Sequence, residues 1–178
     1  PYLMTPKTNG MVVVWELDKP MKSTITYGTS DADKKTLEVP VEEGEKFKGE
    51  SMHMYRARLT DLTPGTTYTY KVETEDGQTM DGHFRTLPEN SNEIRFVVVS
   101  DSHRFETATK VSDVIAQFDP DFILHTGDMV EGTGSQKDQF PYWFQNVGSF
   151  LHNVPVIYNS GNHDYGVYFD EYVTKVQK

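Results

Sequence analysis

Hydrophobic and polar residues alternate along the first half of the chain as they do in β-strands. The segment 10–17 is an apolar run, and segments 23–29, 52–62 and 66–74 alternate with a period of two. Asp76-Gly77 separates segment 66–74 from segment 79–87 and predicts the turn of a β-hairpin. Short strands at roughly 8–12-residue spacing, with no helical period among them, predict an all-β sandwich for residues 1–88.

The alternation also assigns side chains to the two faces of a strand, because successive residues of a strand point to opposite sides. Segment 66–74 places Tyr68, Tyr70 and Val72 on a single face. Segment 52–62 divides into two sets, namely Met52, Met54, Arg56 and Arg58 on one face and His53, Tyr55, Ala57 and Leu59 on the other.

Trp15 lies in an early predicted strand, and Leu62, Pro64, Thr66 and Tyr68 follow one another at two-residue steps. This pattern resembles the fibronectin type III domain, in which a Leu-x-Pro-x-Thr-x-Tyr stretch forms a tyrosine corner. The resemblance implies that Trp15 is a core residue and that the Tyr68 hydroxyl donates a structural hydrogen bond.

The pattern changes after the polar, proline-containing stretch 87–93, where we place a domain boundary. Segment 94–100 is a continuous β-branched run, which predicts a strand buried on both faces, and segments 121–128 and 154–161 contain two more strands. Helical spacing predicts helices over 106–118, 140–151 and 168–178. The apolar faces of the first two consist of Val111, Val114, Ile115 and Phe118, and of Phe140, Trp143, Phe144, Val147, Phe150 and Leu151.

The order β-α-β-α-β-α predicts an α/β region with a parallel sheet over residues 93–178. The charge is concentrated in this second region. Residues 1–88 carry 11 basic against 14 acidic residues, a net charge of −3, whereas the remainder carries 6 against 13, a net charge of −7. An acidic region repels a phosphate backbone, so we expect no nucleic-acid partner.

Other features of composition exclude further classes of site. The chain of 178 residues has no cysteine, which excludes disulfides and thiolate metal sites. No apolar stretch approaches the roughly 18 residues that a membrane span needs. The start of the chain shows no basic and apolar leader, although a chain whose leader had been removed would look the same.

Polar side chains follow each strand of the predicted parallel sheet. Asp101 and His103 come directly after the first strand, and Asp128 follows the second behind Gly127. The third strand leads into the stretch SGNHDYG, which contains Asn162, His163 and Asp164. Because ligands bind beyond the carboxyl ends of parallel strands, these side chains are candidates for one site. Carboxylate, imidazole and amide oxygen together suit Mn, Fe or Zn.

Each of these residues also has a structural interpretation. Asp101 could cap the following helix, Asp128 could be a turn residue, and SGNHDYG could be a polar turn. His125 lies inside its strand run and is expected to be a core histidine or one that supports a ligand from behind. Three such endings in succession, each where a sheet holds its ligands, favour a metal site.

The series Asp101-x-His103, Gly127-Asp128 and Gly161-Asn162-His163-Asp164 resembles the first three motifs of the calcineurin-like metallophosphoesterases. The fibronectin-like front region makes the chain similar to the purple acid phosphatase-like branch of that family. The resemblance implies two metal ions (Fe, Mn or Zn) that lower the pKa of a bridging water and hold a phosphate ester substrate.

The resemblance also implies a role for each residue. Asp101 and His103 would ligate one metal, Asp128 would bridge both, and Asn162 would ligate the second. His163 would protonate the leaving oxygen or stabilise the transition state, and Asp164 would orient His163. The implied activity is that of a phosphomonoesterase of the acid-phosphatase type that uses metal-bound hydroxide.

The chain departs from the family pattern at three points. Purple acid phosphatases usually have glycine where His103 stands and a metal-binding tyrosine where Glu131 stands, so tyrosinate-to-iron colour is not expected. No histidine follows His163, whereas the family completes its site with later histidines that include a Gly-His-x-His motif. We therefore expect that residues 93–178 are the N-terminal half of a catalytic domain, that its third strand lacks a neighbour, and that this chain alone is inactive.

Two alternatives stay open. A phosphodiesterase of the same superfamily, including one for cyclic nucleotides, would use the same motifs. A binding or surface module with a degenerate phosphoesterase half is the second alternative, and the absence of the later histidines from the parent gene would favour it. The expected location is extracytoplasmic, in a bacterial protein that is secreted, periplasmic or displayed at the cell surface. The sequence does not indicate an oligomeric state.

Overall fold

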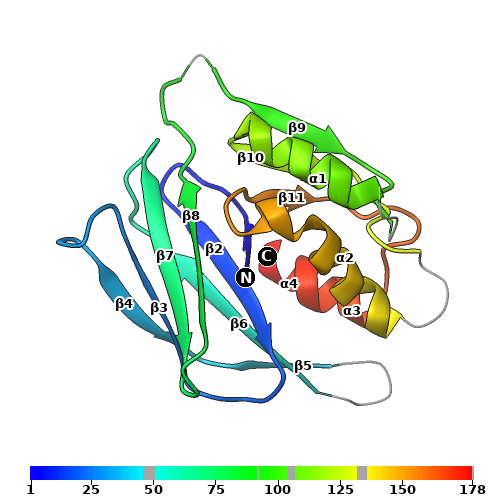
Figure 1. Cartoon of the computed structure of the whole chain (residues 1–178), viewed down its shortest axis with the longest axis horizontal. Coiled ribbons are helices and arrows are strands. Elements are labelled where there is room, and N and C mark those ends of the chain that lie inside the picture. The colour runs from blue at the N-terminus through cyan, green and yellow to red at the C-terminus, as the bar shows by residue number, and fades with distance from the viewer. Residues whose placement is uncertain (46–50, 92, 104–106, 132–135, 178) are drawn as a thin grey trace.

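The computed structural model describes residues 1–45, 51–91, 93–103, 107–131 and 136–177 (Figure 1). The strands of the first half are β1 (Tyr2–Met4), β2 (Met11–Leu17), β3 (Ser23–Gly28), β4 (Lys35–Val39), β5 (Glu42–Glu45), β6 (Ser51–Leu59), β7 (Thr67–Thr74) and β8 (Thr79–Arg85). The second half consists of β9 (Phe96–Val99), α1 (Thr107–Phe118), β10 (Phe122–His125), α2 (Gln136–Leu151), β11 (Val156–Tyr158), α3 (Val167–Phe169), a π-helical turn (Asp170–Thr174) and α4 (Lys175–Gln177).

The first half forms the predicted β-sandwich. One sheet has the order β4-β3-β7-β8, and β7 and β8 form the predicted hairpin. The facing layer is the antiparallel run β5-β6-β2-β1. Trp15 is buried between the layers, where its ring stacks on Tyr55 at a centroid distance of 5.5 Å. The Tyr68 hydroxyl accepts a 2.9 Å hydrogen bond from the Thr63 backbone N–H. The prediction that this hydroxyl is the donor is therefore corrected, because its partner is an N–H group, which can only donate.

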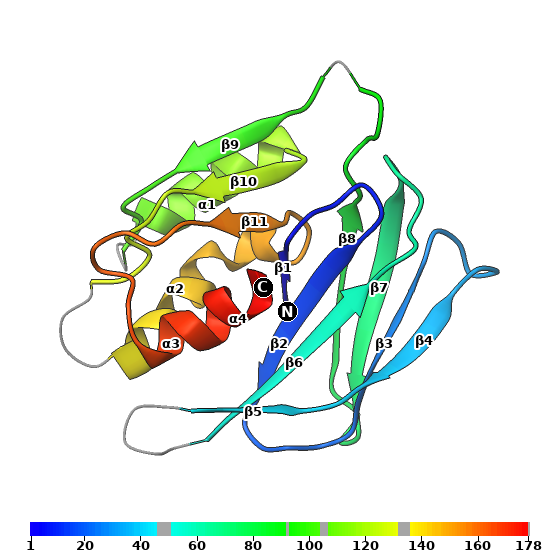
Figure 2. The same cartoon turned by 180° about the vertical axis from the view of Figure 1, so that it is seen from behind.

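The second half confirms the predicted parallel sheet. β10 pairs with β9 on one side and with β11 on the other, both in parallel register. Helices α1 and α2 pack against each other and against the sheet (Figures 1 and 2). The predicted apolar face of α2 is confirmed, because Phe140, Trp143, Val147, Phe150 and Leu151 are buried and Phe144 packs against them.

The third parallel strand has a neighbour, contrary to the prediction. β1 lies between β11 and β2 and pairs with β11 in parallel, with Met4 opposite Val156 (Figure 2). The two halves therefore share one seven-stranded sheet with the order β5-β6-β2-β1-β11-β10-β9. The prediction was wrong because the N-terminal residues supply the missing strand, and a pairing between residues so far apart leaves no local pattern. The proposed boundary at 87–93 marks a change of composition, but the segments on either side of it contribute strands to one sheet. Residue 92 of this stretch lies outside the described residues.

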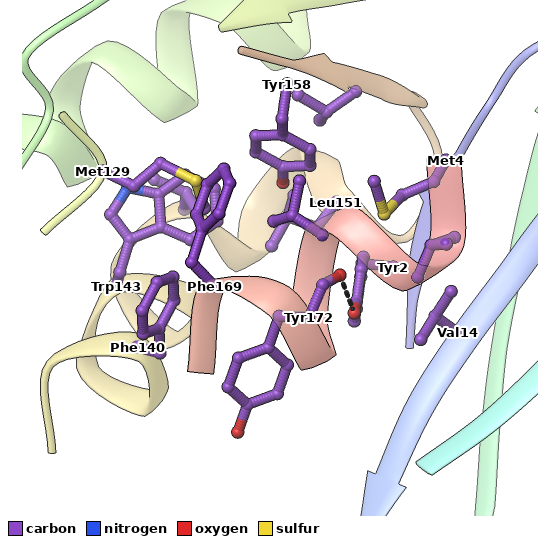
Figure 3. Close-up of a cluster of buried hydrophobic side chains, with 14 of the residues drawn as sticks. Tyr2, Met4, Val14, Met129, Phe140, Trp143, Leu151, Tyr158, Phe169 and Tyr172 are labelled. Atoms are coloured by element: carbon purple, nitrogen blue, oxygen red, sulfur yellow. Dashed lines mark hydrogen bonds between the residues drawn. The ribbon is translucent and has the colours of Figure 1, made fainter. Parts of the chain in front are cut away.

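A second hydrophobic core fills the space between the halves (Figure 3). Met52 and Met54 of β6 lie in this core, whereas Tyr55, Ala57 and Leu59 lie in the sandwich core, which confirms the two predicted faces of that strand. Within the core between the halves, the Tyr2 hydroxyl donates a 2.7 Å hydrogen bond to the Tyr172 carbonyl oxygen. The two faces of the shared sheet thus serve two different cores.

Arg56 links β6 to the C-terminal helical segment. Its guanidinium is buried and donates hydrogen bonds to the Glu42 carboxylate at 2.5 Å and to the Glu171 carbonyl oxygen at 2.6 Å. The same group lies 3.4 Å from the Glu171 carboxylate, which Lys175 also contacts. A buried charge needs such partners, so this contact fixes the helical segment against the sandwich.

Two predictions of burial were wrong. β9 is the edge strand of the sheet, and Phe96 and Val98 are 51% and 55% exposed rather than buried on both faces. In α1 the buried face consists of Ala108, Ser112 and Ile115, whereas Val111, Val114 and Phe118 are at least half exposed. Period alone locates an apolar stripe but cannot say which elements cover it. Residues 106 and 178, where two predicted helices begin and end, lie outside the described residues.

Candidate metal centre

The three predicted site segments meet at one edge of the sheet because their strands are parallel and in register. His125, the last residue of β10, lies opposite Val99 of β9 and Tyr158 of β11. Backbone hydrogen bonds continue past the strand ends. The Asp101 N–H donates to the Gly127 carbonyl at 3.0 Å, and the His103 N–H donates to the Asp128 carbonyl at 3.1 Å. The loops after β9 and β10 are therefore fastened to each other.

Asp101, His103 and Asp128 form a cluster that could hold a metal ion. One ligand atom from each of them lies within 4.8 Å of the ligand atoms of the other two. Asp101 is exposed and the other two are half-buried, so a cation could enter from solvent. Two carboxylates and an imidazole are a donor set that suits Mn, Fe or Zn.

All three residues of this cluster have left-handed backbone conformations. The φ angles are 50° for Asp101, 42° for His103 and 56° for Asp128. Such conformations are uncommon for residues other than glycine and cost on the order of 1–3 kcal/mol each. The surrounding hydrogen bonds must hold these turns, and strain of this kind concentrates at functional sites.

Two glycines allow the second and third segments to approach each other. A Cβ on Gly127 would lie 2.5 Å from the Gly161 nitrogen, and φ of Gly127 is 126°. A Cβ on Gly161 would lie 2.1 Å from the Asp128 carboxylate oxygen Oδ1. The same oxygen accepts a 2.9 Å hydrogen bond from the His163 backbone N–H. Glycine at these two positions is therefore what lets the third segment contact the Asp128 carboxylate.

Two successive carbonyls orient the two histidines. The Nδ1 atom of His103 lies 3.1 Å from the Val130 carbonyl oxygen, and the Nδ1 atom of His163 bonds to the Glu131 carbonyl oxygen. The rings are perpendicular, with centroids 5.3 Å apart. When Nδ1–H donates to a carbonyl, Nε2 of each ring is left to take a metal or a proton. The sequence does not reveal these contacts, because the acceptors are backbone atoms.

Asp164 anchors the loop that holds the histidines. Its buried carboxylate accepts hydrogen bonds from the N–H groups of Met129 at 2.9 Å, Val130 at 3.4 Å and Gly161 at 3.1 Å. The prediction that Asp164 orients the His163 ring differs from these contacts, in which the Glu131 carbonyl bonds to the ring. The carboxylate acts on the backbone of the neighbouring loop because that loop presents free N–H donors.

Asn162 lies between Gly161 and His163 on the same turn and is exposed. Its position next to the His163 backbone, which contacts Asp128, places it beside the cluster. Its role as a metal ligand stays a prediction. The roles predicted for His163, Asp128, Asp101 and His103 likewise stay predictions.

His125 is buried behind the cluster, as expected of a core or supporting histidine. Burial lowers its pKa to about 4, although the nearby carboxylates of Asp164, Asp101 and Asp128 oppose this shift. The imidazole is therefore neutral near pH 7. It contacts Ser102, a residue that we did not predict, although its place between two predicted ligands could have indicated a side chain directed away from them.

Known protein families match both halves of the chain. Residues 2–86 match the purple acid phosphatase N-terminal domain, and residues 94–177 match the calcineurin-like phosphoesterases. A purple acid phosphatase from yellow lupin (Lupinus luteus) seeds is similar in structure, with 21% identity, 92% coverage of this chain and a TM-score of 0.70. PhoD is similar with 14% identity, 92% coverage and a TM-score of 0.65. No curated protein matches the chain.

The chain spans only 35% of the yellow lupin enzyme and 38% of PhoD. At these identities the likeness shows the fold, which is a β domain followed by an α/β region. Within the described part of the chain, no helix has the length and apolar character that would let it cross a membrane.

Proposed function

Residues 94–177 belong to the calcineurin-like phosphoesterases and residues 2–86 to the purple acid phosphatase N-terminal domain, and on this premise we propose that the protein is a metal-dependent phosphohydrolase. Its substrate is a phosphomonoester, and its centre holds two cations (Fe, Mn or Zn). The observation that carries the proposal is the cluster of Asp101, His103 and Asp128 at the carboxyl ends of parallel strands.

The donor set of the cluster fits a cation. Two carboxylates that lie this close repel each other unless a positive charge joins them. The His103 ring is fixed at Nδ1 by a carbonyl, which is the usual support of a metal-binding histidine. In the proposal Asp101, His103 and Asp128 hold one cation, while Asp128 and Asn162 hold the second. Bound cations supply Lewis-acid activation of water and neutralise the charge on the phosphate.

His163 supplies the proton in this proposal. Its Nδ1 atom is engaged by the Glu131 carbonyl, so Nε2 is the atom that delivers a proton to the leaving oxygen of the ester. Asp164 supports this step indirectly, because it holds the loop from which the Glu131 carbonyl projects. Asp101 is exposed and His163 is half-buried, so a substrate can reach both side chains from solvent.

Metal binding by the 178-residue chain is the first test, measured by isothermal titration calorimetry with Mn²⁺, Fe²⁺ and Zn²⁺. Asp128→Asn removes a central ligand charge and is expected to weaken binding at least tenfold. Asp61→Asn is the matched control, because Asp61 is likewise an aspartate with a left-handed backbone, with φ of 57°, but it is exposed and lies in the front half. A wild-type chain that binds none of these ions would refute the proposal.

Hydrolysis is the second test, measured on the full-length product of the gene with p-nitrophenyl phosphate and bis(p-nitrophenyl) phosphate. Faster turnover of the monoester, abolished by Asp128→Asn, is the expected result. Faster turnover of the diester would refute the monoesterase activity and identify the protein as a phosphodiesterase. Metal binding without hydrolysis of either ester would favour a binding module with a degenerate phosphoesterase half.

A further inference from the structure

A chain of hydrogen-bonded side chains, two of them buried and one half-buried, lies directly behind the candidate metal centre. The His125 Nε2 atom lies 2.8 Å from the Ser102 hydroxyl oxygen, and the Trp143 indole N–H donates to the same oxygen at 2.8 Å. His125 and Trp143 are 2% and 1% exposed. Their rings meet edge to face, with centroids 5.8 Å apart. Three polar groups from β10, α2 and the loop after β9 thus satisfy one another at the edge of the core.

The directions of these hydrogen bonds follow from the backbone. The Gly127 N–H donates to His125 Nδ1 at 3.3 Å, so Nδ1 is an acceptor and the ring proton of the neutral imidazole lies on Nε2. His125 therefore donates to Ser102. The Ser102 oxygen accepts from both His125 and Trp143 with its two lone pairs. Removing the hydroxyl would leave two buried N–H groups without this acceptor.

Ser102 lies between two of the candidate metal ligands. Asp101 and His103 on either side of it both have left-handed backbones, and their N–H groups bond to the Gly127 and Asp128 carbonyls. The inward bond of Ser102 is the side-chain contact that fixes the middle of this strained turn. With Ser102 held against the core, the flanking side chains of Asp101 and His103 reach Asp128.

We propose that Ser102 and His125 are positioning residues that hold the turn 101–103 in the conformation in which Asp101 and His103 form the metal centre. The consequence for metal affinity rests on the proposed function, whereas the consequence for the turn itself does not. Residues that support metal ligands from behind typically change metal affinity by about 10–100-fold when they are replaced.

The test uses Ser102→Ala in the 178-residue chain, with two readouts. The first is hydrogen exchange of the Asp101 and His103 amides in metal-free protein, followed by NMR. We expect roughly tenfold faster exchange at both, since the turn loses a buried hydrogen bond, and no change at the Ile123 amide, which bonds to Pro155 within the sheet. The second readout is Mn²⁺ affinity by calorimetry, which we expect to fall about 10–100-fold.

Further variants separate positioning from general loss of stability. Ser102→Thr keeps the hydroxyl, and a cavity lined by Ser102, Ala108 and Ile115 has room for the added methyl group. This variant should therefore show the amide exchange and the Mn²⁺ affinity of the wild type. His125→Gln keeps a donor and should be milder than His125→Leu. Tyr158→Phe is the matched control, because Tyr158 packs beside His125 but its buried hydroxyl has no hydrogen-bond partner among the described residues.

The two readouts distinguish the possible failures. Faster exchange at the two amides together with weaker Mn²⁺ binding supports the positioning role. Faster exchange in a protein whose wild type binds no Mn²⁺ supports the positioning role and refutes the proposed metal centre. Unchanged exchange at Asp101 and His103 in both Ser102→Ala and His125→Leu overturns the positioning role, whatever the metal affinity.

Discussion

Gly161→Ala tests whether the close approach of the second and third segments creates the candidate centre. The new Cβ would lie 2.1 Å from Asp128 Oδ1 and 2.5 Å from the Asp128 nitrogen. Since an ordinary contact begins near 3.4 Å, the shortfall is 3.4 − 2.1 = 1.3 Å, and the Asp128 carboxylate or the Gly161 loop must move by about that amount. Such overpacking costs about 1–3 kcal/mol.

The movement should also disturb the metal cluster. It displaces the Asp128 carboxylate from Asp101 and His103 and breaks the 2.9 Å bond from the His163 N–H. We expect Mn²⁺ affinity, measured by calorimetry, to fall about 10–100-fold. The free energy of unfolding, measured by urea titration of metal-free protein, should fall by about 1–3 kcal/mol.

Gly148→Ala is the control for this prediction. Gly148 lies within α2, and a Cβ there would have no neighbour within 4 Å in the part of the chain that the structure describes. Alanine inside a helix is favoured over glycine by up to about 1 kcal/mol, so this variant should be equally or more stable and bind Mn²⁺ unchanged. If Gly161→Ala bound Mn²⁺ as tightly as wild type and unfolded at the same urea concentration, the steric reasoning would be refuted.

Three further predictions concern stability in urea titrations of metal-free protein. Asp164→Ala leaves three backbone N–H groups without their acceptor and should cost about 3 kcal/mol, and a loss below about 0.5 kcal/mol would contradict the anchoring role. Arg56→Met breaks a buried ion pair with Glu171 and should lower the free energy of unfolding by about 3 kcal/mol. This is the low end of the usual range, because Lys175 still pairs with the Glu171 carboxylate. An unchanged urea midpoint of unfolding would contradict the linking role of Arg56. The pKa of His125 is lower in the folded protein, about 4, than in the unfolded chain, about 6.5, so its stabilising contribution is present above pH 6.5 and is lost as the pH falls to 4. His125→Gln should therefore lose less stability than wild type over that range, and parallel losses would contradict this assignment.

Much of the fold could be predicted because it depends on local periodicity. The period of two in β6 and β7 and the helical spacing in α2 determined both the elements and their buried faces. The same reasoning was wrong for β9 and α1, where Phe96 and Phe118 are exposed. Their apolar character is local, but burial depends on which other elements cover them, and periodicity carries no information about that.

The sequence by itself determined which groups could bind a metal, since the residue types and their places after three apolar runs are local properties. Only the tertiary structure decided how those groups are held. The contacts that hold them join segments far apart along the chain. They are the bonds from the two histidines to the Val130 and Glu131 carbonyls, the bonds from the Met129 and Val130 amides to Asp164, and the contact of Gly161 with Asp128. The pairing of β1 with β11 has the same origin. Backbone donors and acceptors are identical in every residue apart from proline, so nothing in the letters of the sequence says which of them will meet.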